Sequence, residues 1–229
     1  AEPVMGAGGV IVPPAGYFEK VQAVLRKYEV LLIADEVICG FCRTGEMFGS
    51  TTFGLRPDIL TTAKALSSGY VPISALMLSE KLHSAIADNS GRIGTFGHGF
   101  TYSGHPVASA VALETLRIYE EERMLEHVQS IAPRFLQRLK RLGEHPLVGE
   151  ARGVGLIGAV ELSADKAGRT AFDPAAKVGA RVAQLALDEG LVVRAMGDTV
   201  AFCPPLIITA EQVDEMFDRF ERTLQRFEP

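Results

Sequence analysis

Hydrophobic and polar positions follow two different periods in the first 80 residues. Residues 15–29 carry apolar side chains at helical spacing, which predicts an amphipathic helix. Residues 30–36, VLLIADE, form a continuous apolar run that ends in two acids, which predicts a fully buried strand. Residues 57–63 predict another short strand, and residues 71–79 predict a further buried one. Helix and strands at these intervals favour an α/β sheet with parallel pairing.

Helical patterns dominate the part of the chain that follows. Residues 105–142 are mostly helix-forming, and Pro133 predicts the first turn of a new helix. The pattern then predicts, in chain order, strands in residues 148–162, a helix in 175–190 and strands in 191–196 and 199–205.

A capping box predicts the start of the last helix. Thr209 and Gln212 have the required spacing. We expect the apolar face of this helix to be core, and it runs through Val213, Met216, Phe217, Phe220, Leu224 and Phe227. The whole pattern predicts a sheet-containing domain in residues 1–119 and a smaller α+β domain in residues 120–229.

Composition and charge narrow the class of protein. The 229 residues are 47% hydrophobic, enough for a sizeable core, and the net charge is -5. An acidic chain without a basic run is not expected to bind nucleic acid or an anionic membrane. We expect a soluble, cytoplasmic protein. The chain opens on AEPVMGAGG, which reads as the end of a strand, so we also expect a longer parent chain.

The cysteines leave one alternative open. Cys39, Cys42 and Cys203 are an odd number, which does not indicate a disulfide framework. Cys39 and Cys42 form a C-x-x-C, so a metal or redox role has to be considered, but no second ligand pair completes a zinc site. We favour packing and expect no metal.

Two charged residues follow predicted strands. Asp35 follows the run LLIA, where open α/β sheets place ligands, although a helix-capping or loop aspartate fits this position as well. Lys64 lies among small and apolar residues in ILTTAKALSSG. Its stem can pack on the core while the amine reaches water. Alternatively, a desolvated amine with a lowered pKa forms a Schiff base with an aldehyde such as pyridoxal phosphate, and Asp35 would partner the pyridine nitrogen.

A glycine-rich stretch offers donors for a phosphate. Residues 94–106, GTFGHGFTYSGHP, include Thr95, Thr101, Tyr102 and Ser103. Such a loop is weak support by itself, because an ordinary surface turn has the same composition.

Three motifs together carry a family resemblance. In order and spacing, LLIADEVICGFCRTGEMFG, PDILTTAKALSSGYVPISALMLS and GFTYSGHPVASAVALETL closely resemble the class III pyridoxal-phosphate aminotransferases, and most of all the ω-amine:pyruvate transaminases. The resemblance covers essentially the whole chain. It implies fold-type I of the pyridoxal-phosphate enzymes: part of the large mixed-sheet domain in residues 1–119 and the small C-terminal domain in residues 120–229, with the family's N-terminal half absent.

The resemblance also assigns roles to residues around the cofactor. Lys64 would anchor pyridoxal phosphate covalently and then move the proton of the substrate carbon. Asp35 would pair with the pyridinium nitrogen, and Val37 would pack on the ring. Thr101 would bind the phosphate from across a dimer interface, so we expect a homodimer or a dimer of dimers.

Substrate-binding roles follow from the same resemblance. Arg194 would bind the carboxylate of an oxo acid through two hydrogen bonds, although an ordinary exposed arginine on a strand fits the same sequence pattern. Glu2 would lie near the site and pair with an arginine, whereas Arg43 would be a structural or interface residue. Cys42 stands where the family usually has glycine, so we expect its backbone to avoid a conformation that only glycine tolerates.

The implied reaction is ping-pong transfer of an amino group from a primary amine to pyruvate or a similar 2-oxo acid, through pyridoxamine phosphate. Other class III enzymes, including taurine, β-alanine and 4-aminobutyrate transaminases, remain alternatives. A different alternative is a non-catalytic fragment that only dimerises.

Overall fold

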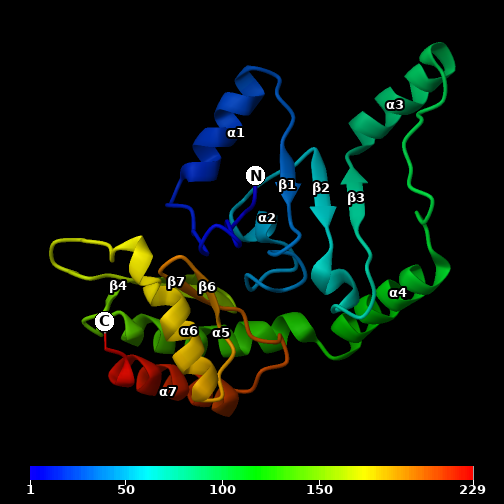
Figure 1. The fold of residues 1–229 in the computed structure, drawn as a ribbon. Coiled ribbons are helices and arrows are strands. Elements are labelled where there is room, and N and C mark those ends of the chain that lie inside the picture. Colours follow the sequence, from blue (N-terminus) through cyan, green and yellow to red (C-terminus); the bar gives the residue numbers. More distant parts are fainter. Residues whose placement is uncertain (229) are drawn as a thin grey trace.

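The computed structural model describes residues 1–228, and two sheets stand in this part of the chain (Figure 1). The first sheet has the order β1-β2-β3, with β1 (Ile33–Asp35), β2 (Ile59–Thr62) and β3 (Ala75–Leu78). The second has the order β4-β5-β7-β6, with β4 (Val148–Val154), β5 (Ile157–Leu162), β7 (Thr199–Phe202) and β6 (Arg194–Met196).

Helices connect and cover these strands. They are α1 (Tyr17–Lys27), α2 (Gly49–Thr52), α3 (Glu80–Ile93), α4 (Pro106–Glu121), α5 (Met124–Leu142), α6 (Val178–Asp188) and α7 (Ala210–Arg226). Two short 3₁₀ turns cover Lys64–Ser67 and Pro174–Ala176. The mixture agrees with the predicted α/β class.

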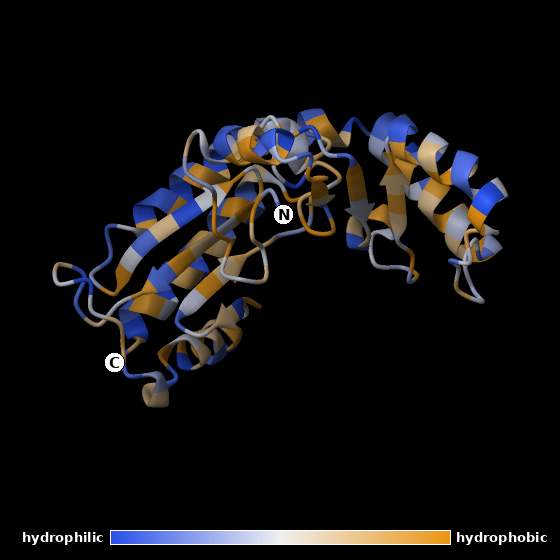
Figure 2. Cartoon of the chain, turned by 90° about the horizontal axis from the view of Figure 1, so that it is seen from above, coloured by the Kyte–Doolittle hydropathy of each residue, from blue (hydrophilic) through white to orange (hydrophobic). Residues whose placement is uncertain are grey.

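The first sheet is less covered than its sequence predicts. β1 and β2 pair in parallel, as expected, whereas β3 is antiparallel to β2. Ile33 is 47% exposed and Leu76 in β3 is 60% exposed, so the prediction of fully buried strands is wrong for this chain. Apolar side chains therefore remain partly exposed on this sheet, and Figure 2 shows how hydrophobic its strands are.

The second sheet is covered on both faces. Helices α5, α6 and α7 pack on one face and enclose aromatic rings, among them Phe135, Phe202 and Phe217. On the other face Ala159 packs with Val4 and Val10 of the N-terminal segment. β5 therefore presents apolar side chains in both directions, with Val160 and Leu162 on the helix side and Ile157 and Ala159 on the other.

The helix boundary between α4 and α5 is not the predicted one. The chain turns at Arg123, whose φ is 51°, and α5 begins at Met124. Pro133 lies inside α5, so the prediction that it opens a helix is wrong. Burial of Phe135 and Leu139 on the second sheet stabilises the helix through the proline, which removes one backbone donor.

The last helix agrees with its prediction. The backbone N–H of Gln212 donates to Thr209 Oγ1 at 3.3 Å, and the Thr209 N–H donates to Gln212 Oε1 at 3.0 Å. Phe217 and Phe220 are fully buried on its apolar face. The division into residues 1–119 and 120–229 is retained as a proposal, and one apolar cluster joins residues on both sides of it.

Candidate active site

Asp35 and Lys64 emerge at one edge of the first sheet. Asp35 is the last residue of β1 and pairs with Thr61 of β2. β2 ends at Thr62, and Lys64 opens the 3₁₀ turn that follows. Because parallel strands end on the same side, the sheet brings a carboxylate and an amine to the edge where open α/β sheets hold ligands.

The Asp35 side chain is held by its own backbone. Its Oδ1 atom accepts a hydrogen bond from the Val37 N–H at 3.0 Å, and both residues are half-buried. No residue within 1–228 donates to Asp35 Oδ2. One carboxylate oxygen is thus oriented and the other is available, which suits a partner that carries a positive N–H.

Lys64 is exposed, so the predicted desolvation of its amine is wrong for this chain. No described element covers the end of β2 above it. Its backbone is in the left-handed region, with φ of 45°, which is uncommon for a residue with a side chain. The Tyr119 hydroxyl of α4 donates to the Ala65 carbonyl at 2.8 Å and lies 3.1 Å from Ser68 Oγ. These bonds hold the strained turn, and burial raises the pKa of Tyr119.

Sequence reasoning missed the role of Glu36. This side chain is fully buried, and its carboxylate accepts from the Gly49 N–H at 2.9 Å and from the Ser50 N–H and Oγ, both at 2.5 Å. The bonds tie the loop after Asp35 to the start of α2. A second acid directly after a buried strand was the available signal, because a buried carboxylate needs several donors.

The two cysteines of the C-x-x-C motif pack in different apolar clusters. Cys39 contacts the group around Val4, and Cys42 joins the main core. Burial raises the pKa of Cys39 to about 12 and that of Cys42 to about 11. Both thiols stay protonated near neutral pH, which agrees with the packing role predicted for them.

The backbone at Cys42 differs from the expectation. Its φ is 71°, so the prediction that this residue avoids the left-handed region is wrong. Hydrogen bonds from Phe41 N–H to the Met47 carbonyl (2.6 Å) and from Gly45 N–H to the Cys42 carbonyl (2.9 Å) close the loop. Complete burial of the Cys42 side chain offsets the strain of this conformation.

Arg43 connects the two parts of the chain. Its Nη1 atom donates to the carbonyls of Leu156, at 2.9 Å, and Pro204, at 2.6 Å. The β4–β5 turn can approach this closely because Gly155, at φ 57°, has no Cβ to strike the Arg43 carbonyl. The contacts agree with the structural role expected for Arg43.

Thr101 lies far from Lys64 within one chain. It is exposed, in the turn ahead of α4, and Tyr119 near the other end of this helix contacts the Lys64 turn. Thirteen residues of helix separate Pro106 from Tyr119, a rise of about 20 Å. The chain by itself does not bring Thr101 to the amine.

Arg194 and Glu2 lie at the junction of the two sheets. Arg194 is exposed at the start of β6 and pairs with Ala201, which packs toward the N-terminal segment. Paired residues share a face, so Arg194 belongs to the face turned to that segment. Glu2 Oε2 accepts the Gly6 N–H at 3.0 Å, and no ion pair joins it to Arg194 in the described chain.

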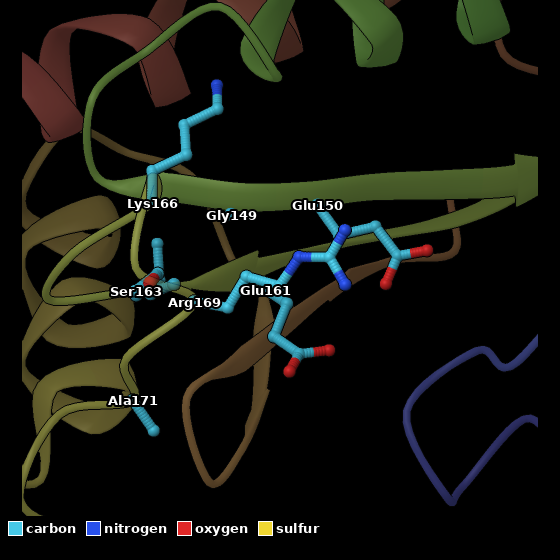
Figure 3. A pocket seen from close by; sticks show the side chains of 8 residues that line it. Gly149, Glu150, Glu161, Ser163, Lys166, Arg169 and Ala171 are labelled. Atoms are coloured by element: carbon cyan, nitrogen blue, oxygen red, sulfur yellow. The ribbon is translucent and has the colours of Figure 1, made fainter.

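A separate hollow lies on the second sheet. It measures about 620 Å³ and is lined by residues of β4, β5 and the loop after them, including Glu150, Glu161, Lys166 and Arg169. Figure 3 shows Lys166 pointing away from the two glutamates. None of the predicted site residues lines this hollow, and its charges balance.

The groups at the Asp35 edge fit pyridoxal phosphate. An available carboxylate oxygen matches the pyridinium nitrogen, the exposed Lys64 amine matches the aldehyde, and Val37 supplies an apolar contact. The phosphate finds no equally clear partner there in one chain.

Comparison with known proteins gives one family. The model of the class III aminotransferases matches residues 1–224. The chloroplastic gamma aminobutyrate transaminase 3 of Solanum lycopersicum is 49% identical over 98% of this chain and 43% of its own length.

Solved structures agree. A transaminase with L-alanine is 56% identical, with a TM-score of 0.96 over 98% of this chain and 53% of its own. The omega transaminase of Pseudomonas jessenii, in complex with PMP, is 52% identical, with a TM-score of 0.95 over 98% of this chain and 50% of its own. The chain spans about half the length of these relatives. It belongs to the class III aminotransferases and has the mixed α/β fold of that family.

Proposed function

We propose that the protein containing this chain transfers an amino group from a primary amine to pyruvate or a similar 2-oxo acid, with pyridoxal phosphate as cofactor. The observation that carries the proposal is the convergence of Asp35 and Lys64 at the edge where β1 and β2 end. Family membership and the similarity to omega transaminases support it.

Three residues would hold the cofactor. Lys64 would bind its aldehyde, Asp35 would pair with its pyridinium nitrogen through the free Oδ2, and Val37 would contact the ring. When bound, the cofactor supplies an electron sink for the charge that develops at the substrate carbon. Asp35 keeps its orientation because the Val37 N–H already occupies Oδ1.

Lys64 would also move a proton. Once the amine substrate has displaced it from the aldehyde, its Nζ would carry a proton from the substrate carbon to the cofactor, and in the second half-reaction it would carry a proton in the reverse direction, to the acceptor's carbon. An amine on an exposed side chain can reach both atoms without a change in the backbone, which the Tyr119 contacts hold fixed.

Arg194 would bind the acceptor's carboxylate. A guanidinium donates two parallel hydrogen bonds to a carboxylate, and an apolar amine offers it no partner. Glu2 would neutralise Arg194 when the amine is bound. Glu2 follows Ala1, whose carbonyl accepts the Asp35 N–H, and Arg194 lies on the face of the second sheet that is turned to the same N-terminal segment.

A second copy of the chain would complete the site. Thr101 stands about 20 Å of helix from the Lys64 turn, so a phosphate contact made by Thr101 would reach the site from another protomer. Phe100, Tyr102 and Val107 around it are 77%, 81% and 60% exposed, an apolar surface that a dimer would bury. We therefore propose a homodimer, and a cytoplasmic location remains part of the same proposal.

Substitution of Lys64 tests the function. In the full-length protein loaded with pyridoxal phosphate, Lys64→Ala is expected to abolish alanine formation from pyruvate and benzylamine. Borohydride reduction and peptide mass mapping should find the cofactor on Lys64 in the wild type only. Lys81→Ala, at an exposed position in α3, is the matched control and should keep full activity. Retained transfer by the Lys64 variant would refute the proposal.

Choice of acceptor separates the alternatives within the family. Gamma aminobutyrate transaminases are among the relatives, so the panel should pair benzylamine, 4-aminobutyrate, β-alanine and taurine with pyruvate and with 2-oxoglutarate. We expect the highest rates with pyruvate. A preference for 2-oxoglutarate would contradict the proposed acceptor. Titration of this chain alone with pyridoxal phosphate tests the non-catalytic alternative, for which no saturable attachment to Lys64 is expected.

A further inference from the structure

Arg152 joins the N-terminal segment to the second sheet. Its Nε and Nη2 atoms donate to the Gly9 carbonyl at 3.1 and 2.9 Å, and Nε also donates to the Val10 carbonyl at 3.2 Å. Nη1 donates to Glu150 at 2.8 Å and to Glu161 at 2.7 Å. The Arg152 side chain is 13% exposed, whereas Glu150 and Glu161 are 60% and 52% exposed, so its bonds to the two carbonyls are the better shielded ones.

The carbonyls that Arg152 holds belong to a strained hairpin. Met5 and Ile11 exchange backbone hydrogen bonds of 3.1 and 3.0 Å, and the hairpin reverses through Gly9, at φ 117°, and Val10, at φ 52°. A β-branched residue in the left-handed region is an outlier that its surroundings must stabilise. Val10 is 1% exposed on the second sheet, and Arg152 fixes its carbonyl from the side.

The hairpin stands between the two groups of site residues. At its start, the Ala1 carbonyl accepts the Asp35 N–H at 2.8 Å, and Glu2 accepts the Gly6 N–H. The dark-blue segment in Figure 1 accordingly runs from the first sheet to the second. Residues 1–11 thus link the Asp35 strand to the face that carries Arg152.

On the face of the second sheet that is turned to the N-terminal segment, Arg152 and Arg194 lie in one row of cross-strand paired residues. Across the strands, Arg152 pairs with Ala159, Ala159 with Ala201, and Ala201 with Arg194. Three strand spacings place the two arginines about 14 Å apart at their Cα atoms. The two alanines between them lie under the N-terminal segment, so a shift of the hairpin changes what Arg194 faces.

We propose that Arg152 is a positioning residue, which holds the hairpin of residues 5–11 so that Arg194, Glu2 and Asp35 keep one fixed geometry for the acceptor's carboxylate. The proposal rests on the proposed function. Arg152 contacts neither substrate nor cofactor and acts through the backbone of Gly9 and Val10. Its loss should weaken binding of the oxo acid, which needs Arg194, more than binding of an apolar amine, which does not.

Two variants test this in the full-length, cofactor-loaded protein. Arg152→Lys keeps the charge but cannot reach two carbonyls and two carboxylates at once. Gly9→Ala perturbs the same contact from the other side, because alanine does not tolerate φ of 117°. Arg169→Lys, an exposed arginine in the neighbouring loop, is the matched control. The readouts are amide hydrogen exchange of Met5 and Ile11, steady-state kinetics, and calorimetric binding of propionate, a carboxylate without an oxo group.

Both variants are expected to raise the KM for pyruvate and the Kd for propionate about tenfold, with the KM for benzylamine within about twofold of wild type. Exchange at Met5 and Ile11 should accelerate in parallel, and Arg169→Lys should match wild type. An equal rise in both KM values, faster exchange with unchanged propionate binding, or no change at all would overturn the positioning role.

The two proposals can fail separately. If the wild type binds propionate but transfers no amino group, the proposed function is wrong, and the ratio of propionate Kd values still decides the role of Arg152. A wild type that binds no propionate overturns the role, because no acceptor site then exists for Arg152 to position.

Discussion

The two sheets of this chain differ in how much of their surface is covered. The second has α5, α6 and α7 on one face and the N-terminal segment on the other, with Phe217 and Val160 fully buried. The first leaves Ile33 and Leu76 about half exposed. The amine and carboxylate of the candidate site stand on the less covered sheet. Stability and chemistry are therefore concentrated in different parts of the chain.

The difference has a counterpart in the kinds of contact. The second sheet is stabilised by apolar packing, whereas the loop next to the first depends on polar contacts such as those of Glu36. A polar anchor fixes direction more strictly than apolar packing does, because its hydrogen bonds require a defined geometry. Asp35 is the residue directly before this anchor.

The largest effect is expected in the second sheet's core. Phe217→Ala should lower the free energy of unfolding by about 3–5 kcal/mol, because it leaves a cavity among rings that contact one another. Urea denaturation followed by circular dichroism measures the change. A loss below about 1 kcal/mol, closer to the effect of a surface substitution than to that of a core one, would mean that this sheet is not the more strongly packed one.

Glu36 tests the polar anchor. Glu36→Ala should cost about 3 kcal/mol, since it leaves buried donors of Gly49 and Ser50 without an acceptor. Glu36→Gln, which keeps the volume and one acceptor oxygen, should cost less. Equal losses for the two variants would show that shape, and not hydrogen bonding, holds this loop.

The loss of stability at alkaline pH tests the burial of the Cys39 thiol. The folded-state pKa of Cys39 is raised from 9.0 to about 12, so its contribution to stability is complete below pH 9.0 and is lost as pH rises toward 12. Between pH 8 and pH 10 the wild type should lose about 1 kcal/mol more than Cys39→Ala. Denaturant titrations at the two pH values measure this, and identical losses would contradict a buried thiol.

The smallest effect is expected on the first sheet. Leu76→Ala should change the stability of this chain alone by less than about 0.5 kcal/mol, because the side chain is already 60% exposed. In the full-length dimer that we propose, the same substitution should cost about 2–5 kcal/mol, as burial of this face would require. A small cost in both proteins would contradict the proposal that this face is covered there.

Periodicity predicted most helices and strands of the fold, because each buries a defined face. The capping box at Thr209 and the position of Asp35 at a strand end were both visible in local sequence. Helix α3 was missed, since none of its side chains is buried and its pattern carries no strong apolar stripe. The prediction for Pro133 was wrong because a proline inside a helix is locally unfavourable, whereas the tertiary packing of α5 tolerates it here.

The candidate site was predictable to a different degree. The strand-end rule brought Asp35 and Lys64 to one edge, but it contains nothing about what covers them, so it could not decide whether the amine of Lys64 is exposed or desolvated. Arg152 had no sequence signal either. Its contacts with Gly9 and Val10 span more than 140 residues and depend on strand register, which the sequence pattern does not determine.

The left-handed backbone at Lys64 bears on which residue type selection would keep at this position. On conformational grounds, glycine or asparagine would suit φ of 45° better than lysine. Under the proposed function, the amine of Lys64 is the reason for lysine at this position. A lineage that no longer needed the reaction would drift toward the more comfortable residues and gain stability as it did so. If Lys64 acts as we propose, the residue at this position would separate proteins that kept the chemistry from those that kept only the fold.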